Sequence, residues 1–138
     1  MTTIIYLSDD PRSNENVTDI LRQEGYTVLL AGNEREGLDM ILEHMPNLVL
    51  YNLTASHEGR HQILDEVRGR YPLLAEMPFI YFSDVADNEQ ILTDLKAGAD
   101  TYITKPVDST LLLAKIHASL RQVKRIKFKH ERLLVLDI

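Results

Sequence analysis

An uninterrupted apolar run, residues 48–51 (Leu-Val-Leu-Tyr), most constrains what this chain can fold into. Pro46 precedes the run and the polar Asn52 follows it. A short apolar run bounded in this way is typical of a parallel strand that is buried on both faces. In an open α/β sheet, ligands bind just beyond the carboxyl ends of such strands. The sequence therefore predicts a central strand with Asn52 at its carboxyl end, at the edge of the sheet where ligands bind.

Apolar runs and helical patterns alternate along the whole chain. We expect strands at residues 4–7, 27–31, 48–51, 78–82 and 101–103, with a helix after each. In the second helix, Asn33 is the expected N-cap, and the expected inner stripe consists of Leu38, Ile41, Leu42 and Met45. This alternation predicts an α/β fold with a doubly wound parallel sheet, in the flavodoxin-like strand order 2-1-3-4-5. Right-handed crossovers then bring the ends of the first, third and fourth strands together.

Composition narrows the classes of function. The 138 residues include no Cys, which excludes disulfides, thiolate metal sites and a cysteine nucleophile. No apolar run approaches the roughly 20 residues of a membrane span, so we expect a cytoplasmic protein without membrane partners. Residues 121–138 hold six of the fifteen Lys and Arg and two of the twenty-one acids, which gives +4 there and −10 in residues 1–120. Such an acidic body disfavours nucleic acid as its partner.

Polar residues follow three other expected strands. Asp9 and Asp10 come after the first, Ser83 after the fourth and Lys105 after the fifth. Adjacent carboxylates at a strand end suit Mg²⁺, although one of them can instead cap the following helix. Taken separately, Ser83 and Lys105 are an ordinary loop hydroxyl and an ordinary surface lysine.

Taken together and in this order, these residues resemble the receiver domain of bacterial two-component response regulators. The resemblance covers about residues 3–123 and includes the acidic pair, Asn52 and Ser83. Its most specific part is residues 98–106 (Gly-Ala-Asp-Thr-Tyr-Ile-Thr-Lys-Pro).

The resemblance implies a role for each matching position in phosphorelay signalling. An Asp at position 52 would accept the phosphoryl group, with Mg²⁺ held by that Asp, Asp9 and Asp10. Ser83 and Lys105 would grip the phosphoryl oxygens. Tyr102 matches the aromatic residue that swings inward when such domains switch. The implied partners are a histidine kinase or an output domain, and the fourth helix, fifth strand and last helix form the implied surface for partners and homodimers.

Three departures surround this site. Asn52 brings an amide, which cannot act as the anionic nucleophile that forms an aspartyl phosphate. The neutral ligand also weakens the expected Mg²⁺ site and removes an ion-pair partner of Lys105. Asp84 places a carboxylate where the family usually has a small residue, and it would repel an incoming phosphate. The loop to Gly59 is one residue shorter than usual and has Ser56 in place of the expected Pro.

We interpret the chain as a pseudo-receiver, a signalling module rather than an enzyme, that is not phosphorylated at Asn52. Two alternatives stay open. The chain can be a working receiver that uses Asp84, Asp9 or Ser83 as acceptor, or a normal receiver with an engineered Asp→Asn change. Because a neutral amide resembles the unphosphorylated state, we expect Tyr102 to point outward.

The C-terminal segment differs in character from the rest. We divide the chain into a receiver-like domain, residues 1–123, and a basic linker or signalling helix, residues 124–138. Leu133, Leu134 and Leu136 are apolar with no domain left to bury them, so the last helix is expected to extend toward a missing or unknown output region. A nucleic-acid or membrane-binding patch is the alternative for this basic segment.

Overall fold

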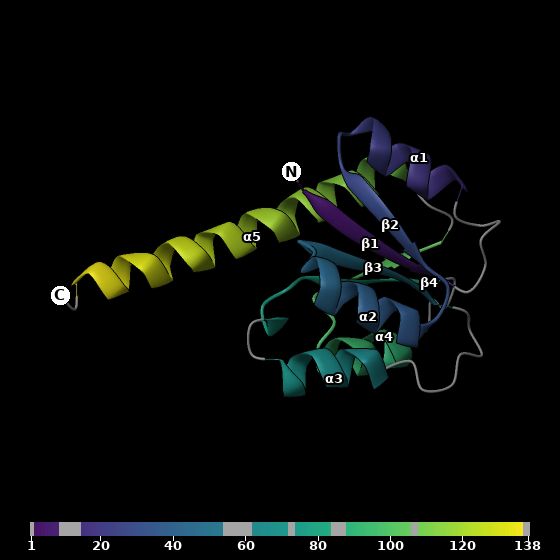
Figure 1. Ribbon diagram of the computed structural model, residues 1–138. Coiled ribbons are helices and arrows are strands. Elements are labelled where there is room, and N and C mark those ends of the chain that lie inside the picture. The colour runs from purple at the N-terminus through teal and green to yellow at the C-terminus, as the bar shows by residue number, and fades with distance from the viewer. Residues whose placement is uncertain are drawn as a thin grey trace.

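One parallel sheet with helices on both faces forms the body of the protein. The computed structural model describes residues 2–8, 15–53, 62–71, 74–83, 88–105 and 108–136, with the backbone only at 15, 53, 88, 90 and 123–136. The strands are β1 (Thr3–Ser8), β2 (Thr27–Ala31), β3 (Leu48–Leu53), β4 (Phe79–Ser83) and β5 (Thr101–Thr104), and the helices are α1 (Glu15–Gln23), α2 (Glu34–His44), α3 (Gln62–Arg70), α4 (Asn88–Lys96) and α5 (Ser109–Leu136). The strand order is β2-β1-β3-β4-β5, all parallel, which confirms the predicted fold (Figure 1).

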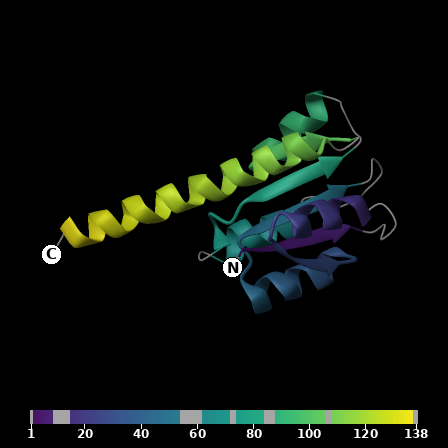
Figure 2. The ribbon, with the colours of Figure 1, turned by 90° about the horizontal axis from the view of Figure 1, so that it is seen from above.

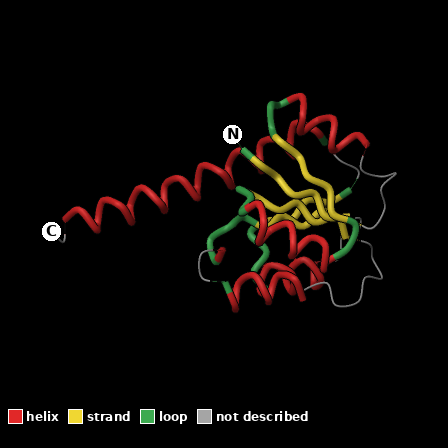
Figure 3. The backbone as a smooth tube through the Cα atoms, viewed as in Figure 1, coloured by secondary structure: helices red, strands yellow, loops and turns green. Residues whose placement is uncertain are grey.

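Each face of the sheet has its own core, because successive residues of a strand point to opposite faces. On one face, α1 and α5 pack against the sheet through Val17, Leu21, Leu112 and Ile116. On the other, α2 and α3 contribute Ile41, Ile63, Leu64 and Val67, and α4 packs with Ile91. Helices therefore lie on both faces of the sheet (Figure 3). Residues 48–51 are buried on both faces, as a central parallel strand requires.

The helix boundaries follow the capping residues of the sequence. Asn33 accepts a 2.8 Å hydrogen bond from the backbone N–H of Glu36 at the start of α2, as predicted. Asp108 does the same for α5, with N–H donors from Thr110 and Leu111 at 2.9 and 3.2 Å. Gly98 follows α4 with φ of 119°, a conformation that glycine adopts without strain.

The expected inner stripe of α2 is wrong at two positions. Leu42 and Met45 are exposed, whereas Gly37 and Ile41 are buried. Gly37 lies against β1, since a Cβ there would come within 3.2 Å of Leu7 Cδ1. Leu42 lies about a third of a turn away from the line through Gly37 and Ile41, and Met45 has left the helix as a left-handed cap with φ of 45°.

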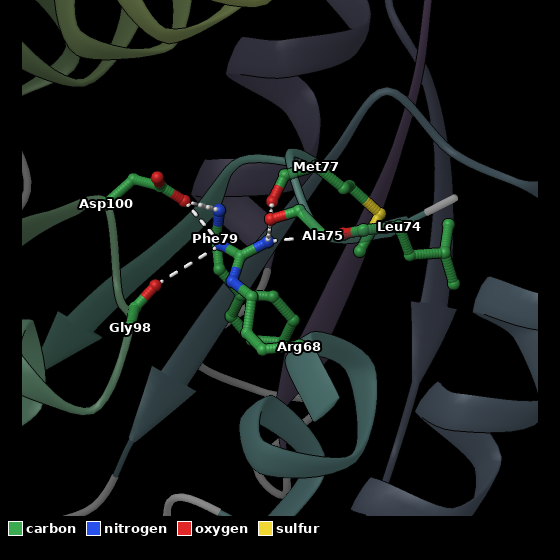
Figure 4. Close-up of polar contacts among 7 residues, drawn as sticks. All are labelled: Arg68, Leu74, Ala75, Met77, Phe79, Gly98 and Asp100. Atoms are coloured by element: carbon green, nitrogen blue, oxygen red, sulfur yellow. Dashed lines mark hydrogen bonds and ion pairs between the residues drawn. The ribbon is translucent and has the colours of Figure 1, made fainter. Parts of the chain in front are cut away.

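A network around Arg68, in the last turn of α3, ties together the segments at the amino ends of β4 and β5 (Figure 4). The guanidinium donates to the carbonyls of Leu74, Ala75 and Met77 at 3.2, 2.8 and 2.7 Å. It also donates to the Gly98 carbonyl at 3.2 Å and to Asp100 Oδ2 at 2.7 Å. The same carboxylate oxygen accepts the N–H of Phe79 at 2.7 Å.

The last helix leaves the body of the protein. Helix α5 covers the sheet with its first turns and then projects away from it as one continuous helix of 28 residues (Figures 1 and 2). The expected boundary near residue 123 therefore falls inside a helix rather than at a turn. Leu133, Leu134 and Leu136 belong to the part of α5 that is described by its backbone only. No described helix is both long and apolar enough to cross a membrane.

Candidate functional site

The carboxyl ends of β1, β3, β4 and β5 meet at one edge of the sheet. Ser8 of β1 is the register partner of Asn52 on β3. Ser83 of β4 is the register partner of Leu53 on one side and Thr104 on the other. Neighbouring strands lie about 4.8 Å apart, so Asn52 and Ser83 stand on adjacent strands, one residue apart in register. The fold thus gathers polar side chains where an open α/β sheet binds its ligands.

Asn52 is held inside the protein. It follows Leu50 by two residues and so points to the face covered by α1 and α5, where its side chain is 3% exposed. Its Nδ2 donates a 3.0 Å hydrogen bond to the hydroxyl of Tyr6, which is fully buried on β1. An amide is neutral and lacks the anionic oxygen with which a carboxylate attacks phosphorus.

Lys105 reaches the site at the end of β5. Its backbone N–H donates to the Ser83 carbonyl at 2.9 Å, which extends the pairing of β4 and β5 to this residue. Its Nζ lies 5.2 Å from the ring centroid of Phe82, a cation–π distance. Phe82 is in turn the register partner of Asn52, so the strand that carries Phe82 lies between residue 52 and the end of β5. Among the described residues, no carboxylate forms an ion pair with Lys105.

Tyr102 is buried, so the expectation that it points outward is wrong. Only 7% of the residue is exposed. Three tyrosines on neighbouring strands are in register, and their ring centroids are separated by 5.8 Å between Tyr51 and Tyr81 and by 6.5 Å between Tyr81 and Tyr102. Tyr81 offers Tyr102 an aromatic surface inside the core, and burying a ring there stabilises more than leaving it in water. The carbonyl of Tyr102 also accepts a 2.7 Å hydrogen bond from Lys115 Nζ on α5.

Three of the predicted site residues, Asp9, Asp10 and Asp84, lie outside the described residues. The described part of the chain contains no group of three or more His, Asp or Glu that could hold a metal ion. The donor set expected for Mg²⁺ would combine Asp9 and Asp10 with the Asn52 amide oxygen. These are hard oxygen ligands of the kind that Mg²⁺ prefers, with one negative charge fewer than a set with Asp at position 52.

Sequence reasoning missed Tyr6 and the two tyrosines that are in register with Tyr102 across the sheet, Tyr51 and Tyr81. The available signal was the occurrence of tyrosine inside apolar strands, since a buried hydroxyl needs a hydrogen-bond partner. The alternation of a strand places Tyr6 and Ser8 on one face. It does not say which residues of the next strand lie beside them, because that depends on the register.

Comparisons with known proteins agree on one family. The family model of the response regulator receiver domain matches residues 4–117. The crystal structure of a CheY-like receiver domain protein from Methanospirillum hungatei JF-1 is 30% identical, with 91% of this chain and 98% of that chain covered and a TM-score of 0.79. The receiver domain of a signal transduction histidine kinase from Syntrophus aciditrophicus is 27% identical, with 91% and 94% covered and a TM-score of 0.78.

A receiver domain protein from Clostridium thermocellum, 23% identical with a TM-score of 0.80, shares the fold over 91% of this chain and 99% of its own. The matched residues 4–117 include every strand from β2 to β5 and most of β1, together with the edge that carries Asn52, Ser83 and Lys105. This chain therefore belongs to the family of response regulator receiver domains of two-component signalling.

Proposed function

We propose that this receiver domain signals through protein contacts and does not accept a phosphoryl group at Asn52. The observation that carries the proposal is the buried amide of Asn52, which is hydrogen-bonded to Tyr6. The resemblance to the family assigns the phosphoacceptor to this position. Formation of an aspartyl phosphate requires a carboxylate oxygen that attacks phosphorus, and an amide has no comparable nucleophile. The domain keeps Ser83 and Lys105, and it departs from the family at the acceptor, at Asp84 and in the loop to Gly59.

The surface of α4, β5 and α5 is the region that we propose for partners. It carries exposed apolar side chains, with Leu92 52%, Leu95 39% and Leu111 46% exposed. Where exposed apolar side chains form a contiguous patch, the patch is typical of a surface that binds another protein. We propose a histidine kinase, an output domain or a second copy of this chain as partner. The continuous helix α5 is a physical connection from this surface to whatever follows residue 136.

A weak Mg²⁺ site at Asp9 and Asp10 belongs to the same proposal. When bound, the ion would contribute positive charge to the edge of the sheet. The neutral amide of Asn52 lowers the electrostatic attraction for a divalent cation relative to a carboxylate. We therefore expect Asn52→Asp to strengthen Mg²⁺ binding.

Intact mass after incubation with Mg²⁺ and acetyl phosphate tests the proposal directly. The wild-type protein should gain no phosphoryl group, and the Asn52→Asp variant under the same conditions is the positive control. A phosphoryl group on the wild type would overturn the proposal, and peptide mapping would then locate it at Ser83, Asp9 or Asp84. If the variant also stays unmodified, the environment of residue 52 adds a barrier of its own.

A further inference from the structure

Tyr6 is the side chain that contacts residue 52 from the neighbouring strand. It pairs in register with Leu50, two residues before Asn52, so both side chains leave the sheet on the same face. The length of a tyrosine spans this offset, and its hydroxyl receives the Asn52 Nδ2 hydrogen bond at 3.0 Å. Tyr6 is fully buried and Asn52 is 3% exposed, so water competes little for this contact.

We propose that Tyr6 is a positioning residue for residue 52, which ties one polar atom of that side chain to β1 and so forms a second barrier to phosphoryl acceptance. This inference rests on the proposed function, in which the amide of Asn52 is the first barrier. It adds that replacement of the amide by a carboxylate does not by itself restore a normal acceptor.

The hydrogen bond reverses its direction when residue 52 is a carboxylate. The hydroxyl of Tyr6 accepts from the Asn52 amide, whereas it would donate to an Asp at the same place, because a carboxylate only accepts. A hydrogen bond to an ionised acceptor is stronger than one between neutral groups. The oxygen that receives it is less basic and already occupied, so it is a poorer nucleophile and a poorer ligand for Mg²⁺.

The reaction that this barrier slows is a simple displacement. An oxygen of the carboxylate at position 52 donates an electron pair to phosphorus of acetyl phosphate, and the bond from phosphorus to the acetyl oxygen breaks. Acetate leaves with that electron pair, and the protein carries an acyl phosphate. Donation from Tyr6 withdraws electron density from the attacking group before the new bond forms.

The hydrogen bond itself is measurable in the protein without any reaction. NMR assignment of the side-chain amide of Asn52 gives its rate of exchange with solvent deuterium. The Tyr6→Phe variant keeps the buried ring and removes the hydroxyl, so we expect exchange of this amide to become about tenfold faster. Tyr81→Phe removes a buried hydroxyl from the opposite face and should leave the exchange rate of Asn52 unchanged. An equal rate in wild type and Tyr6→Phe would overturn the inference.

Phosphorylation rates test the consequence. We expect the double variant Asn52→Asp/Tyr6→Phe to gain a phosphoryl group from acetyl phosphate about tenfold faster than Asn52→Asp, since a hydrogen bond to a charged group is lost from the ground state. Asn52→Asp/Tyr81→Phe is the matched control and should react like Asn52→Asp. The inference fails if Asn52→Asp/Tyr6→Phe reacts at the same rate as Asn52→Asp or more slowly. It also fails if neither of these two variants reacts.

The proposed function and this inference fail in different samples. A phosphoryl group on the wild-type protein would contradict the proposed function whatever the role of Tyr6. Equal phosphorylation rates of Asn52→Asp and Asn52→Asp/Tyr6→Phe would contradict only the role of Tyr6. Circular dichroism and urea denaturation of each variant identify a loss of folding, which would otherwise lower the rate without any change at residue 52.

Discussion

The two edges of the sheet are built in different ways. At the amino ends of β4 and β5, the Arg68 guanidinium donates to four backbone carbonyls and to the Asp100 carboxylate (Figure 4). At the carboxyl edge, Asn52 and Ser83 lie at the ends of β3 and β4, Lys105 directly follows β5, and the Lys105 ammonium lies 5.2 Å from the ring centroid of Phe82.

This difference indicates that residues at the amino edge contribute mainly to stability and that residues at the carboxyl edge contribute mainly to binding and reactivity. The side chain of Arg68 is 19% exposed. Its hydrogen bonds join the segment between α3 and β4 to the segment between α4 and β5. Removal of such a cation leaves several carbonyls without their donor, which is costly in a partly buried place. The side chains of the carboxyl edge are spread over separate strands, so a change there should alter binding and reactivity more than folding.

Arg68→Ala should have the largest effect on stability. We expect the free energy of unfolding to fall by about 3 kcal/mol, because charge-assisted hydrogen bonds to two segments, residues 74–77 and 98–100, are lost together. Urea denaturation measures this change. Arg70→Ala is the control, since Arg70 is exposed and meets Glu66 at 3.5 Å, a surface pair of less than about 0.5 kcal/mol. Equal losses in the two variants would show that the amino edge is not a special source of stability.

Tyr81→Leu should have the next largest effect on stability, and it should also change the accessibility of Tyr102. The middle ring of the three neighbouring tyrosines is lost, with its contacts to Tyr51, Tyr102 and Phe79, and we expect the free energy of unfolding to fall by about 2 kcal/mol. Tyr102 should also become more accessible, which iodination followed by peptide mass spectrometry would detect. Tyr81→Phe keeps the ring and should leave Tyr102 protected. An unchanged Tyr102 in the leucine variant would mean that other contacts hold it inward.

Lys105→Met should have a small effect on folding. The cation–π contact with Phe82 contributes less than about 1 kcal/mol, and a methionine side chain can cover the same ring. Urea denaturation should therefore give nearly the wild-type midpoint. A loss as large as that of Arg68→Ala would remove the contrast between the two edges.

Tyr26→Phe should have the smallest effect, and only in alkaline solution. Burial, and after it the carboxylate of Glu24, raises the pKa of Tyr26 above its usual value. The folded state therefore holds the phenol proton more tightly than the unfolded state does. This contribution to stability is present below the unfolded pKa of about 10 and is lost as the pH rises through the folded pKa. Urea midpoints at about pH 9 and about pH 11 should differ less in the variant than in the wild type; equal differences would contradict the prediction.

The pattern of apolar residues predicted the fold well, and its failures have a geometric cause. Every predicted strand is present, since buried parallel strands leave a continuous apolar run in the sequence. Leu42 and Met45 were expected inside because they follow a helical period. The close approach of Gly37 to Leu7 fixes which side of α2 meets the sheet, and a period alone does not contain that information.

The sequence predicted where the residues of the candidate site lie in the fold, but not which side chains they contact. Asn52, Ser83 and Lys105 were expected at strand ends, and they lie at one edge because the strands are parallel and adjacent. The inward position of Tyr102 was not predicted, because it depends on Tyr81 on the neighbouring strand.

The sequence by itself determined the order of the strands and helices, the edge at which polar residues gather, and the neutral character of residue 52. These properties are local or follow from a repeating pattern, so the linear order of residues contains them. Only the tertiary structure decided that the Asn52 amide meets Tyr6 and that Tyr102 packs on Tyr81. Both contacts cross between strands, and they depend on the register in which distant segments pair when the cores on the two faces are buried together.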